Sequence, residues 1–214
     1  MPSIMLNSTP MESTKPIIGV LSLSDPNTSV ALSVIDLLGG AARVCVPDTS
    51  VDGLDGLCVL GNDGIGLSDS PVPVLLTESL NADIPLLAIE GGMHALNMVL
   101  GGDPPVPTPA HCSEDGNLAK DGMFMALGSK LADTIGGAGF VSPSSCHARG
   151  ISRGVLAPGT LASAYSNSDG TIEAFEVTAN QWVIAVQWPA HRLEDQPSGF
   201  DNLFHALIGH STDG

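Results

Sequence analysis

Residues 83–102, which read D-I-P-L-L-A-I-E-G-G-M-H-A-L-N-M-V-L-G-G, constrain the fold more than any other stretch of this chain. Residues 84–89 form a short, almost wholly apolar run rich in branched side chains, typical of a strand buried on both faces of a parallel sheet. Residues 93–100 change to helical spacing. Glu90 stands between the two periods and is followed by two glycines. This order predicts a nucleophile elbow, a strand that turns sharply into a helix with one side chain at the apex.

The same reading along the chain predicts an α/β fold. Strands are predicted at residues 16–23, 42–46, 55–60, 84–89, 123–127, 161–166, 171–177 and 182–188. Helices are predicted from residue 27 or 28 to 38, and over residues 74–81, 93–100, 129–135 and 200–208. Strands that alternate with helices through short turns favour a mostly parallel central sheet with helices on both faces. Residues 101–116, rich in proline and polar side chains, are expected to form an exposed, irregular loop.

The elbow segment resembles that of the class I glutamine amidotransferase-like proteins. Residues 88–94 (A-I-E-G-G-M-H), with Asn97 and the glycine pair at 101–102, resemble G-I-C-R-G-M-Q-x-x-N-V-x-x-G-G of the γ-glutamyl-γ-aminobutyrate hydrolases (the γ-glutamyl hydrolase type). The resemblance covers about residues 15–210 and implies a three-layer, flavodoxin-like fold with the site at the carboxyl ends of the strands. That family has a cysteine at the apex, whereas this chain has Glu90.

Two further segments carry the resemblance. The segment S-S-C-H-A-R resembles the family's N-S-x-H-H-Q, with His147 in the place of the first histidine and Arg149 in the place of the glutamine. The segment V-Q-W-P-A-H resembles V-Q-W-H-P-E, with Pro189 at the position of the general-base histidine and His191 at that of the glutamate. Together with Glu90, the three positions of the family's Cys-His-Glu triad therefore all differ in residue type.

The resemblance also assigns the remaining site residues. The turn after the third strand and the residue after the apex supply the oxyanion-hole N–H groups in that family. The predicted site comprises Glu90 at the nucleophile position, His191 and His147 as catalytic residues, and Gly61, Asn62, Gly91, His94 and Arg149 as oxyanion-hole or ligand-binding residues. His94 could equally be a polar-face residue, or a core histidine bonded to a backbone carbonyl. No cofactor and no metal is predicted.

The chemistry of a carboxylate at the apex leaves several interpretations open. A carboxylate that attacks an amide forms an adduct that expels the carboxylate again, so thiol-type γ-glutamyl amide hydrolysis is not expected of Glu90. The first interpretation is a binding, regulatory or subunit role on an inherited scaffold. The second is redirected chemistry, with Glu90 as general base or anchor beside His147 or His191, or residual γ-glutamyl amide hydrolysis. The third, a metal site of Glu90, His147 and His191, has no local ligand spacing to support it. The expected ligand is a small amine- or glutamyl-related molecule.

Composition limits the partners and the location. Seven basic and 23 acidic residues give a net charge of −16, which argues against nucleic acid or an anionic membrane as a partner. No apolar run is long enough to span a bilayer. Residues 1–15 are expected to be a flexible polar tail rather than a signal peptide, and residues 16–214 a single domain. A homodimer and a complex with a partner subunit both stay open.

The cysteines and the remaining histidines carry no motif. Four cysteines without paired metal or redox spacing favour a reducing cytoplasm. Cys45 and Cys58 are expected to be packed thiols, and Cys146 to be packed or exposed rather than a displaced nucleophile. Surface positions are expected for His111, His205 and His210, and core positions for Trp182 and Trp188.

Overall fold

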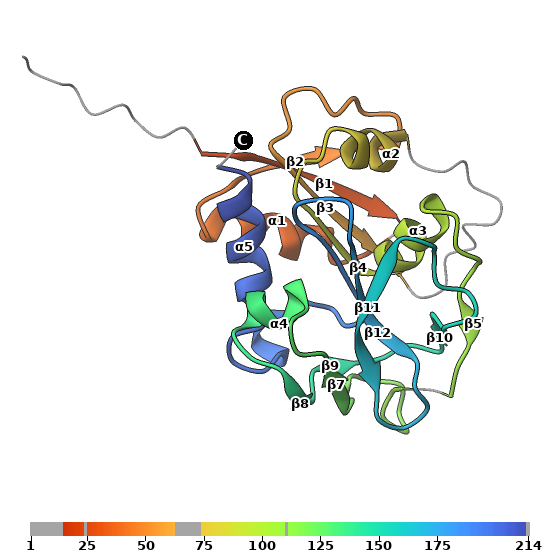
Figure 1. The fold of residues 1–214 in the computed structure, drawn as a ribbon. Coiled ribbons are helices and arrows are strands. Elements are labelled where there is room, and N and C mark those ends of the chain that lie inside the picture. Colours follow the sequence, from red (N-terminus) through yellow and green to blue (C-terminus); the bar gives the residue numbers. More distant parts are fainter. Residues whose placement is uncertain (1–14, 24, 63–73, 110, 213–214) are drawn as a thin grey trace, which may run out of the picture.

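The central sheet runs through the whole molecule (Figure 1). The computed structural model describes residues 15–23, 25–62, 74–109 and 111–212, and within them this sheet has nine strands in the order β2-β1-β3-β4-β13-β12-β11-β7-β8. The strands are β1 Ile17–Leu23, β2 Ala41–Cys45, β3 Gly56–Gly61, β4 Leu86–Glu90, β7 Met123–Met125, β8 Gly139–Val141, β11 Thr160–Ser166, β12 Ile172–Val177 and β13 Val183–Val186. Two small antiparallel pairs join β5 Val106–Pro107 to β10 Arg149–Gly150, and β6 Ala119–Lys120 to β9 Ser144–Ser145.

The sheet has a parallel part and an antiparallel extension. Strands β2, β1, β3, β4 and β13 pair in parallel, in the order typical of flavodoxin-like folds. Strands β12, β11, β7 and β8 continue the sheet in antiparallel pairs. The predicted α/β class with a mostly parallel central sheet is confirmed. The two strands predicted at residues 161–166 and 171–177 form an antiparallel hairpin, because β11 and β12 pair across the turn at residues 167–171.

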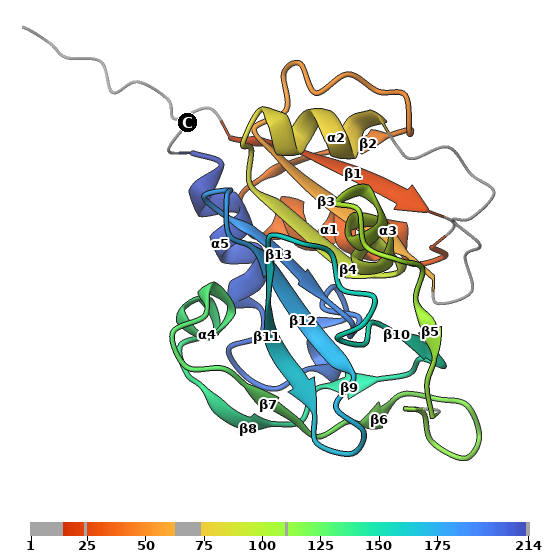
Figure 2. The same cartoon turned by 45° about the vertical axis from the view of Figure 1, so that its right-hand side comes forward.

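The helices cover both faces of the sheet (Figure 2). They are α1 Thr28–Leu37, α2 Val74–Asn81, α3 Gly91–Val99, α4 Lys130–Ile135 and α5 Asn202–His210, with a 3-10 turn, η2, at Leu193–Asp195. The side chains of strand β4 pack alternately on the two faces of the sheet. Leu87 and Ile89 pack into the core beneath α1, α4 and α5, while Leu86 and Ala88 pack into the core beneath α2 and α3. A strand with apolar side chains on both faces therefore lies at the centre of three layers.

Local signals in the sequence explain the helix ends. The Ser129 hydroxyl accepts a hydrogen bond from the Ala132 N–H and caps α4, and Gly136 ends that helix in the left-handed region at φ 90°. After α3, Asn97 is fully buried and clamps the following loop. Its amide donates to the carbonyls of Asp103 and Val155 and accepts from the Ala157 N–H. The asparagine of the elbow segment therefore has a structural role.

The proline-rich stretch at residues 101–116 differs from its prediction. It contains β5, which pairs with β10, and it carries His111 into the interior, where this residue is only 8% exposed. The expectation of a surface position for His111 is wrong, because its two ring nitrogens form hydrogen bonds with the carboxylates of Asp121 and Asp169. Trp182 and Trp188 lie in the core as predicted, and His205 and His210 lie on the surface.

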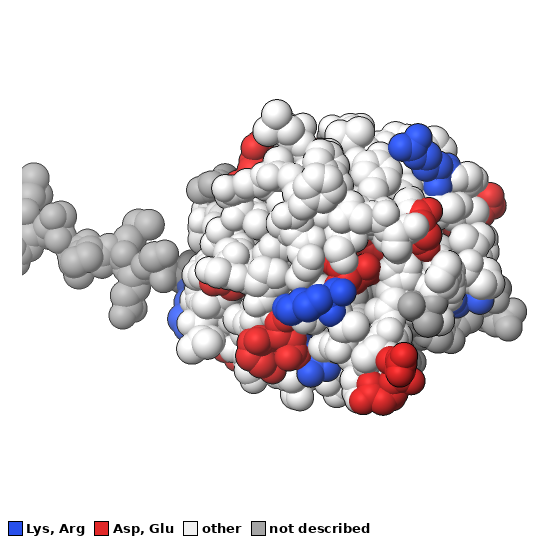
Figure 3. All heavy atoms as spheres, turned by 90° about the horizontal axis from the view of Figure 1, so that it is seen from below, with Lys and Arg blue, Asp and Glu red and all other residues white. Residues whose placement is uncertain are grey.

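Uncharged residues make up most of the face shown in Figure 3, and several of its acidic and basic side chains lie directly beside one another in the lower middle of the view. Among the described helices, none combines the length and apolar character that crossing a bilayer requires. The predicted tail at residues 1–15 lies almost wholly outside the described residues.

Candidate functional site

The turn from β4 to α3 has the geometry of a nucleophile elbow. Strand β4 ends at Glu90 and helix α3 begins at Gly91. Glu90 has φ 53° and ψ −119°, a conformation that side-chain-bearing residues rarely adopt; in the described part of the chain only Asp83 is the other non-glycine residue with positive φ. Such strain persists only where surrounding structure enforces it. The apex is thus held in place by its neighbours.

Glycines make this enforcement possible. A Cβ on Gly92 would stand 2.3 Å from the carbonyl oxygen of Val59, and a Cβ on Gly91 would stand 2.5 Å from that of Asn62. A Cβ on Gly61 would stand 2.6 Å from the carbonyl carbon of Gly91. The end of β3 and the start of α3 therefore touch backbone to backbone, which only glycine permits. Gly61, Asn62 and Gly91 are the predicted oxyanion-hole positions, and their roles in a reaction stay predictions.

Two further groups join Glu90 at the carboxyl ends of the parallel strands. Leu23, Gly61 and Glu90 lie in one row across β1, β3 and β4. Asp25 follows β1 just beyond this row, and His191 follows β13. One side-chain ligand atom each of Asp25, Glu90 and His191 lies within 4.8 Å of the others. The sequence did not single out Asp25, because its place depends on the order of strands.

His191 is the most enclosed member of this elbow group. Its side chain is fully buried, and neither ring nitrogen has a hydrogen-bond partner among the described residues. Burial lowers the pKa of His191 below its ordinary value, against the opposing influence of the Asp25 carboxylate. The ring is therefore neutral near pH 7 and able to accept a proton.

His147 belongs to a different cluster. Its ligand atoms group with those of His111, Asp121 and Glu173, again within 4.8 Å of one another, and not with Glu90 and His191. The cluster lies at the same end of the sheet as the elbow, since the Glu173 carbonyl accepts from the N–H of Gln187, just beyond β13. The structure thus separates two histidines that the sequence had grouped.

Buried charge dominates this second cluster. Burial disfavours the charged form of His147, but the carboxylates of Asp121 and Glu173 outweigh it and raise the pKa of His147 to about 10. Burial likewise raises the pKa of Glu173, while the histidines, working against burial, lower that of Asp121. Sequence reasoning missed three of the four members.

The remaining predicted residues have structural contacts. His94 is buried on α3 and its Nε2–H donates to Gln187 Oε1 at 2.8 Å, so it is a core histidine bonded to a side-chain amide. Arg149 is exposed, and its guanidinium donates to the Pro105 carbonyl at 2.6 Å. Asn62 is exposed at the end of β3, and residues 63–64 of the predicted turn lie outside the described residues.

All four cysteines are described, and two of them form a disulfide. Cys45 and Cys58 are buried free thiols, as expected, and burial raises the pKa of Cys58 to about 12. Cys112 and Cys146 are joined by a disulfide across 34 residues of sequence. The sequence analysis did not predict this pairing, because the fold brings together two loops whose spacing does not reveal it. The expectation of a reducing compartment rested on unpaired thiols.

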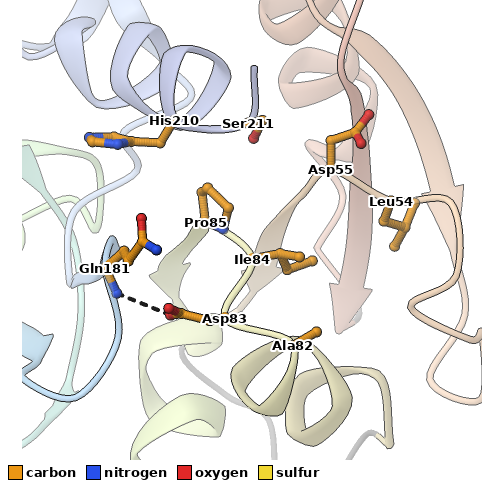
Figure 4. Close-up of a pocket in the computed structure, with 9 residues that line it drawn as sticks. All are labelled: Leu54, Asp55, Ala82, Asp83, Ile84, Pro85, Gln181, His210 and Ser211. Atoms are coloured by element: carbon orange, nitrogen blue, oxygen red, sulfur yellow. Dashed lines mark hydrogen bonds between the residues drawn. The ribbon is translucent and has the colours of Figure 1, made fainter. Parts of the chain in front are cut away.

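Two cavities lie away from Glu90. The larger, about 380 Å³, sits at the amino ends of β3 and β4, opposite the elbow, and Asp83, Gln181 and His210 line it (Figure 4). The Gln181 N–H donates to Asp83 Oδ1 there, at 3.0 Å. The second, about 340 Å³, is bordered by His111 and Asp121 of the histidine–carboxylate cluster. Glu90 lines neither of these two cavities.

The fold is shared with solved structures of other proteins. The chain superposes on a candidate GMP synthase subunit from Thermoplasma acidophilum with a TM-score of 0.74, at 18% identity, covering 94% of this chain and 96% of the other. It superposes on a chain of PurLQS from Thermotoga maritima with a TM-score of 0.69, at 12% identity, covering 92% and 99%.

The family is shown by sequence. The chain belongs to the Peptidase C26 family, whose profile matches residues 69–191. It is also 33% identical, over 141 residues, to a candidate glutamine amidotransferase of Mycobacterium tuberculosis. That match covers 63% of this chain but only 42% of the relative, so the chain spans less than half the length of this relative.

Proposed function

We propose that this Peptidase C26 protein uses its elbow to bind a small molecule and does not hydrolyse γ-glutamyl amides through a thiol. In this interpretation the protein derives from γ-glutamyl hydrolase-type enzymes in which a cysteine stood where Glu90 stands. The observation that carries the proposal is the group of Asp25, Glu90 and His191, which places two carboxylates and an imidazole at the apex of the elbow.

The state of the cysteines supports the first half of the proposal. A cysteine attacks an amide as its thiolate, which requires a lowered pKa and access to the substrate. Cys45 and Cys58 are buried with raised pKa values, and Cys112 and Cys146 are consumed in the disulfide. None of the four cysteines therefore provides a nucleophilic thiolate.

The charge of the elbow group indicates the ligand. Glu90 is only partly buried, so its carboxylate is placed to meet a ligand, and Asp25 adds a second acidic group. A primary amine or another hydrogen-bond donor suits these groups, whereas the α-carboxylate of a glutamyl moiety would be repelled if it approached them. The proposed ligand class is a small amine, or a glutamyl compound bound through its amino group.

His191 gives a specific reason for a second candidate. It is neutral, buried and without a hydrogen-bond partner among the described residues, beside two carboxylates. Such a ring can take up a proton from a bound molecule while Glu90 anchors it. The second candidate is therefore an enzyme with redirected acid–base chemistry. A subunit role is a variant of the first, in keeping with the synthase-subunit name of the Thermoplasma acidophilum protein.

A hydrolysis assay tests the first half of the proposal. The purified full-length chain and its Glu90→Ala variant are incubated with glutamine and a panel of γ-glutamyl anilides and amines, and released ammonia or amine is measured. We expect the two proteins to release the same background amount. Release by the unaltered chain above that of the variant would refute the proposal.

A binding assay tests the second half. A panel of small amines and their N-acetylated counterparts is screened by thermal shift, and hits are measured by calorimetry. We expect amines, but not their acetylated forms, to bind, and Glu90→Gln to weaken binding without lowering the melting temperature of the free protein. A Gln variant that binds normally would remove Glu90 from the site. Turnover of a bound amine that fails in His191→Gln would favour the second candidate.

A further inference from the structure

Four side chains converge in the antiparallel half of the protein. His111 follows β5, Asp121 precedes β7, His147 follows β9 and Glu173 lies on β12. One ligand atom from each lies within 4.8 Å of all the others. His147 is 2% exposed and Glu173 1%. Burying ionisable groups in this way is costly unless they are paired or bind a metal.

Pairing within the cluster is incomplete. His147 Nε2 and Glu173 Oε1 have no hydrogen-bond partner among the described residues, although both atoms are buried. His147 Nε2 lies 3.6 Å from Glu173 Oε2 and 3.8 Å from Asp121 Oδ2, and His111 Nδ1 lies 3.9 Å from Glu173 Oε1. These separations are too long for hydrogen bonds. Ligands about 2.1 Å from a tetrahedral ion lie roughly 3.4 Å apart, close to these separations.

Outer hydrogen bonds orient both rings toward the centre. His147 Nδ1–H donates to the Arg149 carbonyl at 3.0 Å, which leaves Nε2 to face the carboxylates. His111 Nε2 lies 3.2 Å from Asp169 Oδ2, which leaves Nδ1 to face inward. Asp169 is itself fixed, because it accepts from both the N–H and the hydroxyl of Thr171. Outer partners of this kind hold the histidines of metal sites.

The backbone around the two histidines is preorganised. The disulfide joins the residue after His111 to the residue before His147. The His111 N–H also donates to the His147 carbonyl at 3.0 Å, and the two rings stack with centroids 4.4 Å apart. The cavity of about 340 Å³ beside His111 and Asp121 gives access from the surface. Lys120 also lines this cavity, and its ammonium donates a hydrogen bond to the Asp195 carbonyl, 3.1 Å away.

We propose that His111, Asp121, His147 and Glu173 bind a divalent transition-metal ion, for which Zn²⁺ is the best match. Two imidazoles and two carboxylates suit Zn²⁺ and its first-row neighbours, whereas Mg²⁺ and Ca²⁺ favour oxygen ligands alone. In this arrangement the ion displaces the short hydrogen bond that now joins His111 Nδ1 to Asp121 Oδ2 at 2.6 Å.

The elbow group of Asp25, Glu90 and His191 is the weaker candidate for a metal. It offers a single histidine, and that histidine has no outer hydrogen bond to set its orientation, because both ring nitrogens lack a partner among the described residues. The proposed site is independent of the proposed function of the elbow, and the elbow therefore provides a matched control.

The experiment uses the full chain, purified without a histidine tag and dialysed against a chelator. ZnCl₂ is titrated by calorimetry, and the visible spectrum is recorded with Co²⁺ alone. We expect one Zn²⁺ per chain and the intense visible absorption of four-coordinate Co²⁺. Glu173→Gln and His147→Gln should abolish both signals. Glu90→Gln in the elbow group, and His205→Gln on the surface, should retain them.

A graded variant separates a ligand from its support. Asp169→Asn changes the outer contact of His111 and the contacts of Asp169 with Thr171, but removes no proposed ligand, and should weaken Zn²⁺ affinity by about 10–100-fold, less than the loss of a ligand. Circular dichroism confirms that each variant folds. The proposal is overturned if the unaltered chain binds no stoichiometric Zn²⁺, or gives only the weak Co²⁺ spectrum of a six-coordinate ion. It is also overturned if folded Glu173→Gln binds as the unaltered chain does.

Discussion

His94 Nε2 and Gln187 Oε1 lie 2.8 Å apart in the interior and join the elbow helix α3 to the segment that follows β13. His94→Ala should lower the free energy of unfolding by about 1–3 kcal/mol, because the buried amide of Gln187 loses its partner. Urea denaturation of His94→Ala, Gln187→Ala and the double variant measures the coupling. His205→Ala, at an exposed histidine, should change stability by no more than about 0.5 kcal/mol. Additive effects of the two single variants would contradict an energetic role for this contact.

Gly92 packs on the backbone of Val59, which cannot move aside as a side chain can. Gly92→Ala should therefore destabilise the protein by about 1–3 kcal/mol or more. Gly209, in α5, has nothing within 4 Å of a Cβ and no positive φ. Gly209→Ala should be neutral or stabilise the protein by up to about 1 kcal/mol. Thermal and urea unfolding of Gly92→Ala and Gly209→Ala measure the two changes in stability. Equal effects of the two variants would contradict the close backbone approach at the elbow.

Backbone strain at Glu90 can be separated from the side chain. Glu90→Ala and Glu90→Gly both remove the carboxylate, but only glycine adopts φ 53° and ψ −119° without strain. Glu90→Gly should therefore be more stable than Glu90→Ala by about 1–3 kcal/mol. Chemical denaturation of the two variants gives this difference directly. If alanine were as stable as glycine, the apex would not be strained.

The elbow could be found from sequence because its signal is local. Residues 84–100 change from a buried-strand pattern to a helical one within a few positions, and two glycines mark the turn. The partners of Glu90 and His147 are set by tertiary structure instead. Asp25 joins Glu90 because β1 lies beside β3, and Glu173 meets His147 because Ile151, just after β10, pairs with Ile172 at the start of β12. Neither neighbour relation leaves a trace in spacing, and the same holds for Cys112 and Cys146.

The disulfide should contribute substantially to stability. It closes a loop between residues separated by 34 positions, and loss of such a cross-link costs about 2–4 kcal/mol. Cys112→Ser/Cys146→Ser should show this loss in urea denaturation and should bind Zn²⁺ more weakly than the unaltered chain. Alkylation of the denatured, unreduced chain should label only Cys45 and Cys58. Labelling of all four cysteines in protein purified under air would show that the bond does not form.

Stability should depend on pH through His191. Its pKa is lowered by burial in the folded state, so between that value and about 6.5 the unfolded chain binds more protons than the folded one. Protonation therefore favours unfolding, and the contribution of His191 is present above about pH 6.5 and lost as the pH falls. The groups around it act in both directions, with Asp25 and Glu194 favouring the proton and Arg192 opposing it.

The corresponding measurement compares the unaltered chain with His191→Gln from pH 5 to 8. The difference in unfolding free energy isolates His191 from His111 and His147, whose raised pKa values act in the opposite direction. The advantage of the unaltered chain over the variant should shrink as the pH falls below about 6.5. A difference that stays constant over this range would contradict the lowered pKa.

The pairing of β4 with β13 has a consequence for synthesis on the ribosome. Ile89 is paired with Val186, so one side of the strand that carries Glu90 stays unpaired until β13, about a hundred residues later, has been made. In the meantime, β4 is an open, apolar edge of the kind that joins other chains. Fragments that stop before β13 should therefore aggregate or recruit chaperones, although they contain the entire elbow.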